Sequence, residues 1–205
     1  MSNLLRNAAA TVMLSALTAP AYAHHPMGGA MPSTLWEGLA SGVGHPVIGL
    51  DHLAFIVVAG LIAGVAGLGI LAPVAFVAAS LAGVGLHLAL VNLPAVELII
   101  ALSVLIVGGL VALSRSGGGA VVWMAAFALA GIFHGYAYGE AVVGAEPTPI
   151  VAYLIGLALV QAAIAVAVAK LAASQAWLPQ SVQPRLVGAA VFGVGLSAVV
   201  GQVVG

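Results

Sequence analysis

The sequence contains no cysteine and very few charged residues. Without cysteine the chain has no disulfide and no thiolate ligand, so a metal could be held only by imidazole, carboxylate, thioether or backbone oxygen. Charged residues make up 4% of the 205 positions, whereas soluble domains carry about 25%. The composition therefore excludes a water-soluble domain. It also excludes a basic surface for nucleic acid, in agreement with the net charge of −1.

Apolar residues, in contrast, make up 63% of the chain. They are gathered into runs of about 20 residues, the length that crosses a lipid bilayer as a helix. Glycine, proline and asparagine mark the joints between these runs. The sequence predicts an all-α polytopic membrane protein embedded in a lipid bilayer, with six transmembrane helices over residues 46–67, 70–91, 95–113, 119–138, 150–172 and 186–204.

Residues 1–23 have the pattern of a cleaved signal peptide. Arg6 precedes a short apolar core, and Ala21-Tyr22-Ala23 forms an A-x-A cleavage site. The alternative is an uncleaved first membrane helix. After cleavage, the amine and imidazole of His24 could chelate one metal together, with His25 adding a second ring; the alternative is a terminus with two functionless histidines.

Residues 24–44 are expected to form a mobile periplasmic segment before the transmembrane domain of residues 45–205. Thr34-Leu35-Trp36-Glu37 fits a capping box, in which a threonine and a glutamate cap the same helix start reciprocally. It predicts a short interfacial helix ending near Ser41, anchored by Trp36.

The stretch His45-Pro46-Val47-Ile48-Gly49-Leu50-Asp51-His52 places ionisable side chains at the start of the first long apolar run. Such residues are costly inside a membrane, which makes them functional candidates. Proline favours the first position of a helix, so we expect the helix to begin at Pro46, with His45 as its cap. His45 and His52 would then share one face. Asp51 could bind a metal or orient His52; the alternative for the group is a capped helix start.

A second such stretch, Phe133-His134-Gly135-Tyr136-Ala137-Tyr138-Gly139-Glu140, ends the fourth predicted helix. His134 should lie at a depth similar to that of His52, so we expect the two side chains to meet. Glu140 lies nearer the surface. His87 has a similar depth and is a weaker candidate. Gln161 could line an exit path or bond a neighbouring helix.

The few charges follow a pattern along the predicted topology. With an external N-terminus after cleavage, six helices place all three mature cations in or beside inner loops, as the positive-inside rule requires. Every mature carboxylate and histidine falls on the outer half. An acidic, imidazole-lined opening of this kind attracts cations. The cations are Arg115, Lys170 and Arg185, and the carboxylates are Glu37, Asp51, Glu97, Glu140 and Glu146.

With both stretches considered, the chain resembles the HupE/UreJ family of nickel and cobalt permeases. The residues that carry the resemblance are His45-x5-Asp51-His52 and Phe133-His134-Gly135-x-Ala137 with Glu140. The resemblance implies roles for these histidines and carboxylates in moving Ni²⁺ or Co²⁺, in support of hydrogenase or urease. The expected location is a bacterial inner membrane, and the placement of the cations predicts that both mature termini are periplasmic. Many relatives carry a histidine where this chain has Tyr138, which puts the metal's identity in question.

The expected function is thus inward transport of a divalent transition metal, with no enzymatic activity and no tightly bound cofactor. Zn²⁺ and Cu²⁺ are alternative cargoes, because affinity order alone does not choose among these ions. Two other functions use the same residue types. One is a metal-binding accessory subunit of a membrane complex. The other is an intramembrane zinc hydrolase with Asp51 or Glu140 as general base. The sequence sets neither the oligomeric state nor the energy coupling.

Overall fold

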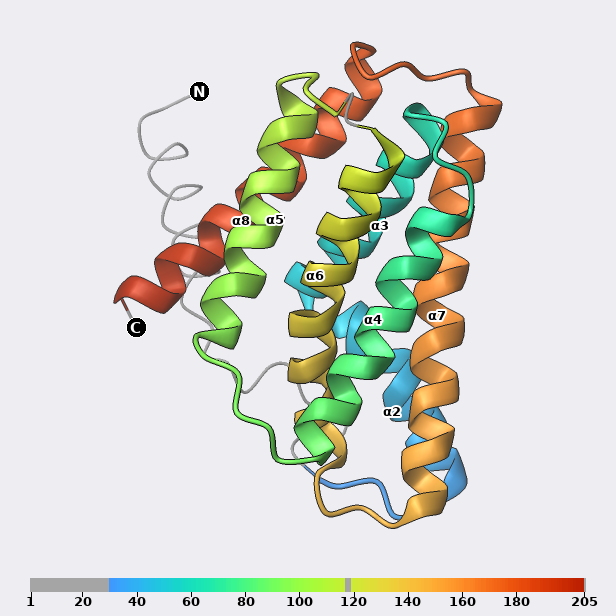
Figure 1. Cartoon of the computed structure of the whole chain (residues 1–205), viewed down its shortest axis with the longest axis vertical. Helices are drawn as coiled ribbons and strands as arrows, with labels where there is room; N and C mark the ends of the chain where they lie inside the picture. The colour runs from blue at the N-terminus through green and yellow to red at the C-terminus, as the bar shows by residue number, and fades with distance from the viewer. Residues whose placement is uncertain (1–29, 117–118, 205) are drawn as a thin grey trace, which may run out of the picture.

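The computed structural model describes residues 30–116 and 119–204 (Figure 1). Within these ranges every regular element is helical, as predicted. The predicted signal peptide, His24 and His25 lie outside the described residues. The elements are α2 (Leu35–Ile48), α3 (Leu50–Val65), α4 (Leu71–Leu88), α5 (Val96–Ala112), α6 (Ala120–Gly139), the 3₁₀ turn η2 (Glu140–Val142), α7 (Pro147–Ser174) and α8 (Val182–Val204).

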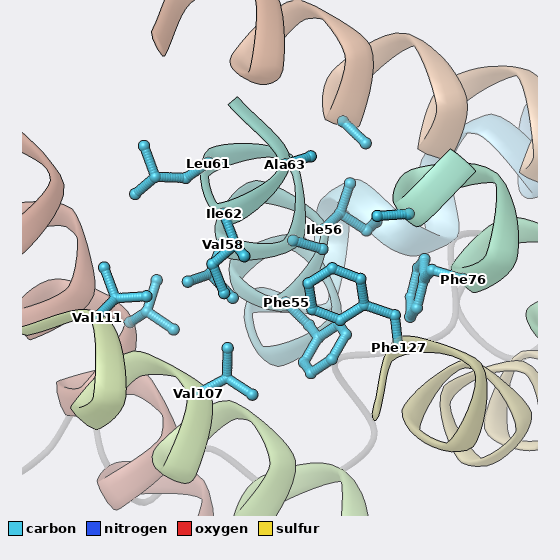
Figure 2. Close-up of a cluster of buried hydrophobic side chains, with 14 of the residues drawn as sticks. Phe55, Ile56, Val58, Leu61, Ile62, Ala63, Phe76, Val107, Val111 and Phe127 are labelled. Carbon is cyan, nitrogen blue, oxygen red and sulfur yellow. The ribbon is translucent and has the colours of Figure 1, made fainter. Parts of the chain in front are cut away.

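Helix α3 forms the centre of the bundle. Its side chains from Phe55 to Ala63 are almost all buried, and Figure 2 shows them surrounded by residues of the neighbouring helices. Phe55 stacks on Phe76 of α4 with ring centroids 5.2 Å apart, and meets Phe127 of α6 edge-on at 6.1 Å. This apolar core fixes α3 relative to α4 and to α6, and α3 and α6 each contribute a histidine to the site described below.

Glycines bring the helices into backbone contact. In the α4–α6 pair, Gly135 lies against the Ser80 carbonyl and Gly83 against the Ile132 carbonyl. The other contacts of this kind join α2 to α7, α3 to α7 and α5 to α8. Helices in lipid gain little from burying apolar surface against each other, so small residues that allow close approach hold them together.

The chain between His45 and His52 differs from its prediction. Helix α2 does not end near Ser41 but continues to Ile48, so that Pro46 lies inside it. Gly49, with extended backbone angles, separates α2 from α3, and the two helices meet at 78°. We call this bend the elbow. His45 is therefore in the last turn of α2 and is not the cap of a helix that contains His52. Proline is favoured at a helix start, and inside a helix it removes one backbone hydrogen bond, so the local sequence favoured a start at Pro46 over the position found.

The capping box is confirmed. The Thr34 hydroxyl accepts a hydrogen bond from the Glu37 backbone N–H at 3.2 Å, and the Glu37 carboxylate accepts one from the Thr34 N–H at 3.2 Å. The carboxylate also accepts from the backbone and hydroxyl of Ser33. These bonds satisfy donors that the first turn of a helix leaves open, which explains why α2 begins where the sequence predicted.

Four elements are long and apolar enough to cross a membrane by themselves: α4, α6 with η2, α7 and α8. Helices α2 and α3 pass the same test only together, as a bent pair, and α5 is shorter, with 17 residues. The described residues thus contain four candidate spans, or five if the bent pair is one span. All six predicted apolar segments are helical, but six complete crossings are not confirmed.

Charge is segregated along the bundle. One buried cluster joins the ends of α3, α5 and α7 to the beginnings of α4, α6 and α8. We call this the cationic end, because the described cations Arg115, Lys170 and Arg185 lie there. The opposite end, the histidine end, contains the elbow and the ends of α4 and α6; Glu37, Glu97, Glu140 and Glu146 lie there. The predicted separation of charge is confirmed within the bundle, and the compartment that each end faces remains a prediction.

The close approach of α4 and α6 yields a stability prediction. Gly135→Ala would add a Cβ that collides with the Ser80 backbone, which can yield only if the helices separate. We expect a loss of about 1–3 kcal/mol, typical of overpacking, seen as a lower unfolding temperature of the purified protein in detergent. Gly85→Ala on α4 is the control, since its added Cβ meets nothing within 4 Å. Equal unfolding temperatures for the two variants would contradict the backbone contact.

Candidate metal site at the elbow

Three histidines from three helices meet at the elbow. His45 belongs to α2, His52 to α3 and His134 to α6. The ring centroids of His45 and His52 are 6.0 Å apart, and those of His52 and His134 are 5.0 Å apart. All three side chains are buried. The predicted meeting of His52 with His134, 82 positions later, is confirmed.

His134 is held at both ring nitrogens. Its Nε2 lies 3.0 Å from the Ser103 hydroxyl, and that hydroxyl donates its own proton to the Ile100 carbonyl at 2.7 Å. Ser103 therefore accepts a hydrogen bond from Nε2–H, and Nδ1 of the neutral His134 ring is an acceptor. His52 Nδ1, 2.8 Å away, then donates to it. This assignment leaves Nε2 of His52 without a proton.

Tyr153 of α7 determines the tautomer of His45, as Ser103 does for His134. Its hydroxyl donates to the Tyr138 carbonyl at 2.8 Å, so it must accept from His45 Nδ1 at 2.9 Å. Nε2 of His45 is consequently unprotonated. A metal-binding histidine usually donates its other ring N–H to a neighbouring group, which fixes the ring and its tautomer. Both His45 and His52 have this arrangement.

Asp51 places a carboxylate beside these rings. It lies in the first turn of α3, is 9% exposed, and its Oδ1 accepts a hydrogen bond from the His52 backbone N–H at 2.8 Å. Carboxylates are stabilised at this position by the positive end of a helix. The ring of His52 is oriented by His134 through Nδ1. The other role that the sequence suggested for Asp51, binding a metal, stays a prediction.

Aromatic rings enclose the three imidazoles. Tyr138 lies 4.3 Å from His52 and 5.1 Å from His45 between ring centroids. Phe55 lies 4.7 Å from His134 on another side. Because these rings exclude water, electrostatic interactions within the cluster are stronger than on a hydrated surface.

Two other predicted site residues lie apart from this cluster. His87 Nδ1 donates to the Tyr136 carbonyl at 2.7 Å, and its ring stacks on Tyr136 with centroids 4.3 Å apart. Gly139 packs against the His87 side chain. Glu140 is exposed in η2. The structure thus gives His87 a packing role between α4 and α6, and a role of either residue in binding metal remains a prediction.

The arrangement is not a preformed coordination shell. Among the described residues, no group of three or more histidine and carboxylate side chains is placed so that it could hold one metal ion. The reason is visible in the His52–His134 pair, whose Nδ1 atoms face each other across a hydrogen bond. Binding of one metal ion by several of these side chains therefore requires them to reorient.

The sequence predicted neither of the two hydroxyl groups that set these tautomers. Ser103 is the only polar side chain between Leu98 and Ala112 of α5. That isolation was a usable signal, because polar side chains in membrane helices form interhelical bonds. Tyr153 near the start of α7 looked like an ordinary interfacial aromatic residue. Only the fold shows that it reaches His45.

Helix lengths, composition and the buried imidazole cluster define the chain as a helical membrane protein with a candidate site for a transition metal. A family model described as HupE / UreJ protein matches residues 12–198. The chain therefore belongs to the HupE/UreJ family, which is associated with nickel or cobalt uptake or with accessory functions and is not a family of enzymes. No curated protein and no solved structure matches the chain.

Proposed function

We propose that the protein is a permease that moves a divalent transition metal, Ni²⁺ or Co²⁺, inward from the histidine end to the cationic end. The observation that carries the proposal is the meeting of three buried imidazoles from three helices, those of His45, His52 and His134, with the carboxylate of Asp51 next to His52 in the chain. Imidazole nitrogen is a preferred ligand of these borderline ions.

In this proposal, the carboxylates at the histidine end attract the cation before it reaches the elbow. The ion then exchanges part of its water shell for Nε2 of His45 and His52. Asp51 compensates its charge in surroundings where an isolated ion would be very costly. The membrane potential favours inward movement by about 2.3 kcal/mol per charge per 100 mV. The cationic end lies last on the path, where the positive charges of Arg115 and Arg185 discourage return.

Uptake by purified protein in lipid vesicles tests this function. Vesicles with an inside-negative potential would be offered radiolabelled Ni²⁺, Co²⁺ and Zn²⁺ separately, and we expect accumulation of Ni²⁺ or Co²⁺ above that in protein-free vesicles. An accessory subunit would bind metal without moving it across the membrane. Binding in detergent together with no accumulation in vesicles would thus reject the permease.

Metal binding should weaken in acid. A proton and a metal compete for the same Nε2 lone pair, and histidines ordinarily titrate near pH ~6.5. Below that pH, we expect affinity to fall about tenfold per pH unit for one imidazole ligand and about a hundredfold for two. Calorimetric titration of purified protein with Ni²⁺ between pH 8 and 5.5 measures this slope. A pH-independent affinity would exclude imidazole ligands.

A further inference from the structure

Two buried oxygen atoms close to the elbow take no part in the site described so far. Gln161 of α7 donates its Nε2–H to the Ser80 hydroxyl of α4 at 3.2 Å. Its carbonyl oxygen Oε1 has no hydrogen-bond partner among the described residues, and the same is true of the Tyr138 hydroxyl. Both side chains have 0% exposure. Leaving a buried polar group unsatisfied costs about 1–3 kcal/mol, so two such groups need a reason.

Packing places the two oxygens at about the same depth. The Ser80 backbone lies against Gly135 of α6, which fixes the level of the Gln161–Ser80 bond. Tyr138 lies three residues later on α6, a rise of about 4.5 Å. Long side chains on a helix lean toward its N-terminus, which for α6 is the cationic end. A tyrosine side chain is long enough to span that rise, which is the basis for placing its hydroxyl near the level of Gln161.

The two oxygens also face the same helices. Tyr138 packs in a buried cluster with Val84 of α4 and Leu157 of α7. One turn further toward the cationic end, these helices present Ser80 and Gln161. Tyr138 thus packs against Val84 and Leu157, which lie one helical turn from Ser80 and from Gln161.

The elbow lies between the contacts that α2 and α3 make with α7. Helix α2 lies against α7 at Gly42 and Tyr153, and α3 lies against α7 at Gly60 and Ala165. Between these two contacts the chain turns by 78°. Gln161 lies within this interval, on the buried face of α7.

We propose that the Tyr138 hydroxyl and Gln161 Oε1 form an oxygen-only station for the transported divalent ion, one step beyond the histidines toward the cationic end. The proposal rests on the proposed function. Imidazole nitrogens bind Ni²⁺ and Co²⁺ more firmly than neutral oxygens do, and conduction requires each site to be weak enough to release the ion. The nitrogen site captures the metal, and the oxygen station accepts it with part of its water shell.

The decisive variant is Tyr138→Phe, because it removes the hydroxyl and keeps the ring against His45 and His52. If the hydroxyl had no ligand, its removal would leave uptake unchanged and would be neutral or stabilising. We expect instead that Ni²⁺ affinity in detergent stays within about threefold, while Ni²⁺ uptake into vesicles falls by about 10–100-fold, as for other supporting groups around metals.

Gln161→Leu should give the same separation of binding from transport. The double variant should be no slower than the slower single variant, because both oxygens act on the same ion. Tyr136→Phe is the matched control. Its ring stacks on His87, apart from the cluster, and its uptake should equal that of the parent.

Each remaining outcome overturns the station. Parental uptake by both Tyr138→Phe and Gln161→Leu would mean that the oxygens do not contact the ion, while the permease stands. Loss of Ni²⁺ binding by Tyr138→Phe would make the hydroxyl part of the histidine site. A parental protein that transports no metal would reject the proposed function, and the station with it.

Discussion

Asp51→Asn is expected to reduce metal uptake to less than about one hundredth of the parental rate. Asparagine keeps the size of the side chain and an oxygen that can accept the His52 backbone N–H, so the start of α3 is preserved. It removes the negative charge. An uncompensated buried charge costs about 3–5 kcal/mol, which corresponds to two or more powers of ten. Radiolabelled uptake into vesicles, normalised to reconstituted protein, measures the change.

Glu37→Gln is the matched control for Asp51→Asn. It also exchanges a carboxylate for an amide in the first turn of a helix, but at the exposed start of α2. A glutamine still supports a capping box, so uptake should stay near the parental rate. Transport by Asp51→Asn at the parental rate would leave Asp51 with only a structural role at the start of α3.

His134→Phe is expected to weaken metal binding by about 10–100-fold and to slow uptake at least as much. Phenylalanine preserves the packing against Phe55 and Phe76, but it removes the acceptor that orients His52. His52 would then populate both tautomers and several ring positions. Ser103→Ala, which acts one bond further away, should have a smaller effect in the same direction. Calorimetry with Ni²⁺ gives the affinities.

His87→Asn is the histidine control for this series. The asparagine amide can still donate to the Tyr136 carbonyl in place of Nδ1, so this bond between α4 and α6 is retained while the ring stacking on Tyr136 is lost. We expect affinity and uptake near the parental values. If His87→Asn lost as much affinity as His134→Phe, the site would have to extend to α4 beyond the geometry described.

Much of the bundle could be predicted because membrane helices are set by local properties. Apolar length defines where a helix can cross, and glycine-rich or proline-rich joints define where it stops. The predicted segment 95–113 became Val96–Ala112, and 119–138 became Ala120–Gly139. The sequence did not predict the elbow, because this bend depends on contacts of the chain with α7. Gly42 and Gly60 both lie against that helix, and no local pattern shows that the chain must bend between them.

For the site, the sequence predicted the depth of each histidine side chain in the bundle better than it predicted which neighbours that side chain faces. His52, His87 and His134 were all placed toward one end of the bundle, as found. Yet His87 faces Tyr136, whereas His52 and His134 face each other. A side chain's depth follows from its position along a run, but the side on which it lies depends on helix rotation and packing. The hydroxyl groups of Ser103 and Tyr153 were missed for the same reason.

The break at Gly49 also has an electrostatic consequence. In a continuous helix, the peptide dipoles would be aligned head to tail along the whole stretch that carries the histidines. No helix terminus would then lie near the histidine rings. Here, α2 ends and α3 begins beside His45 and His52, so two helix termini are exposed to the site. A helix terminus is equivalent to roughly half an elementary charge, negative at the C-terminus of α2 and positive at the N-terminus of α3. Asp51 neutralises the positive terminus through the His52 N–H. The backbone of α2 then contributes net negative potential at His45. Under the proposed function, the peptide chain itself helps to solvate the transported cation.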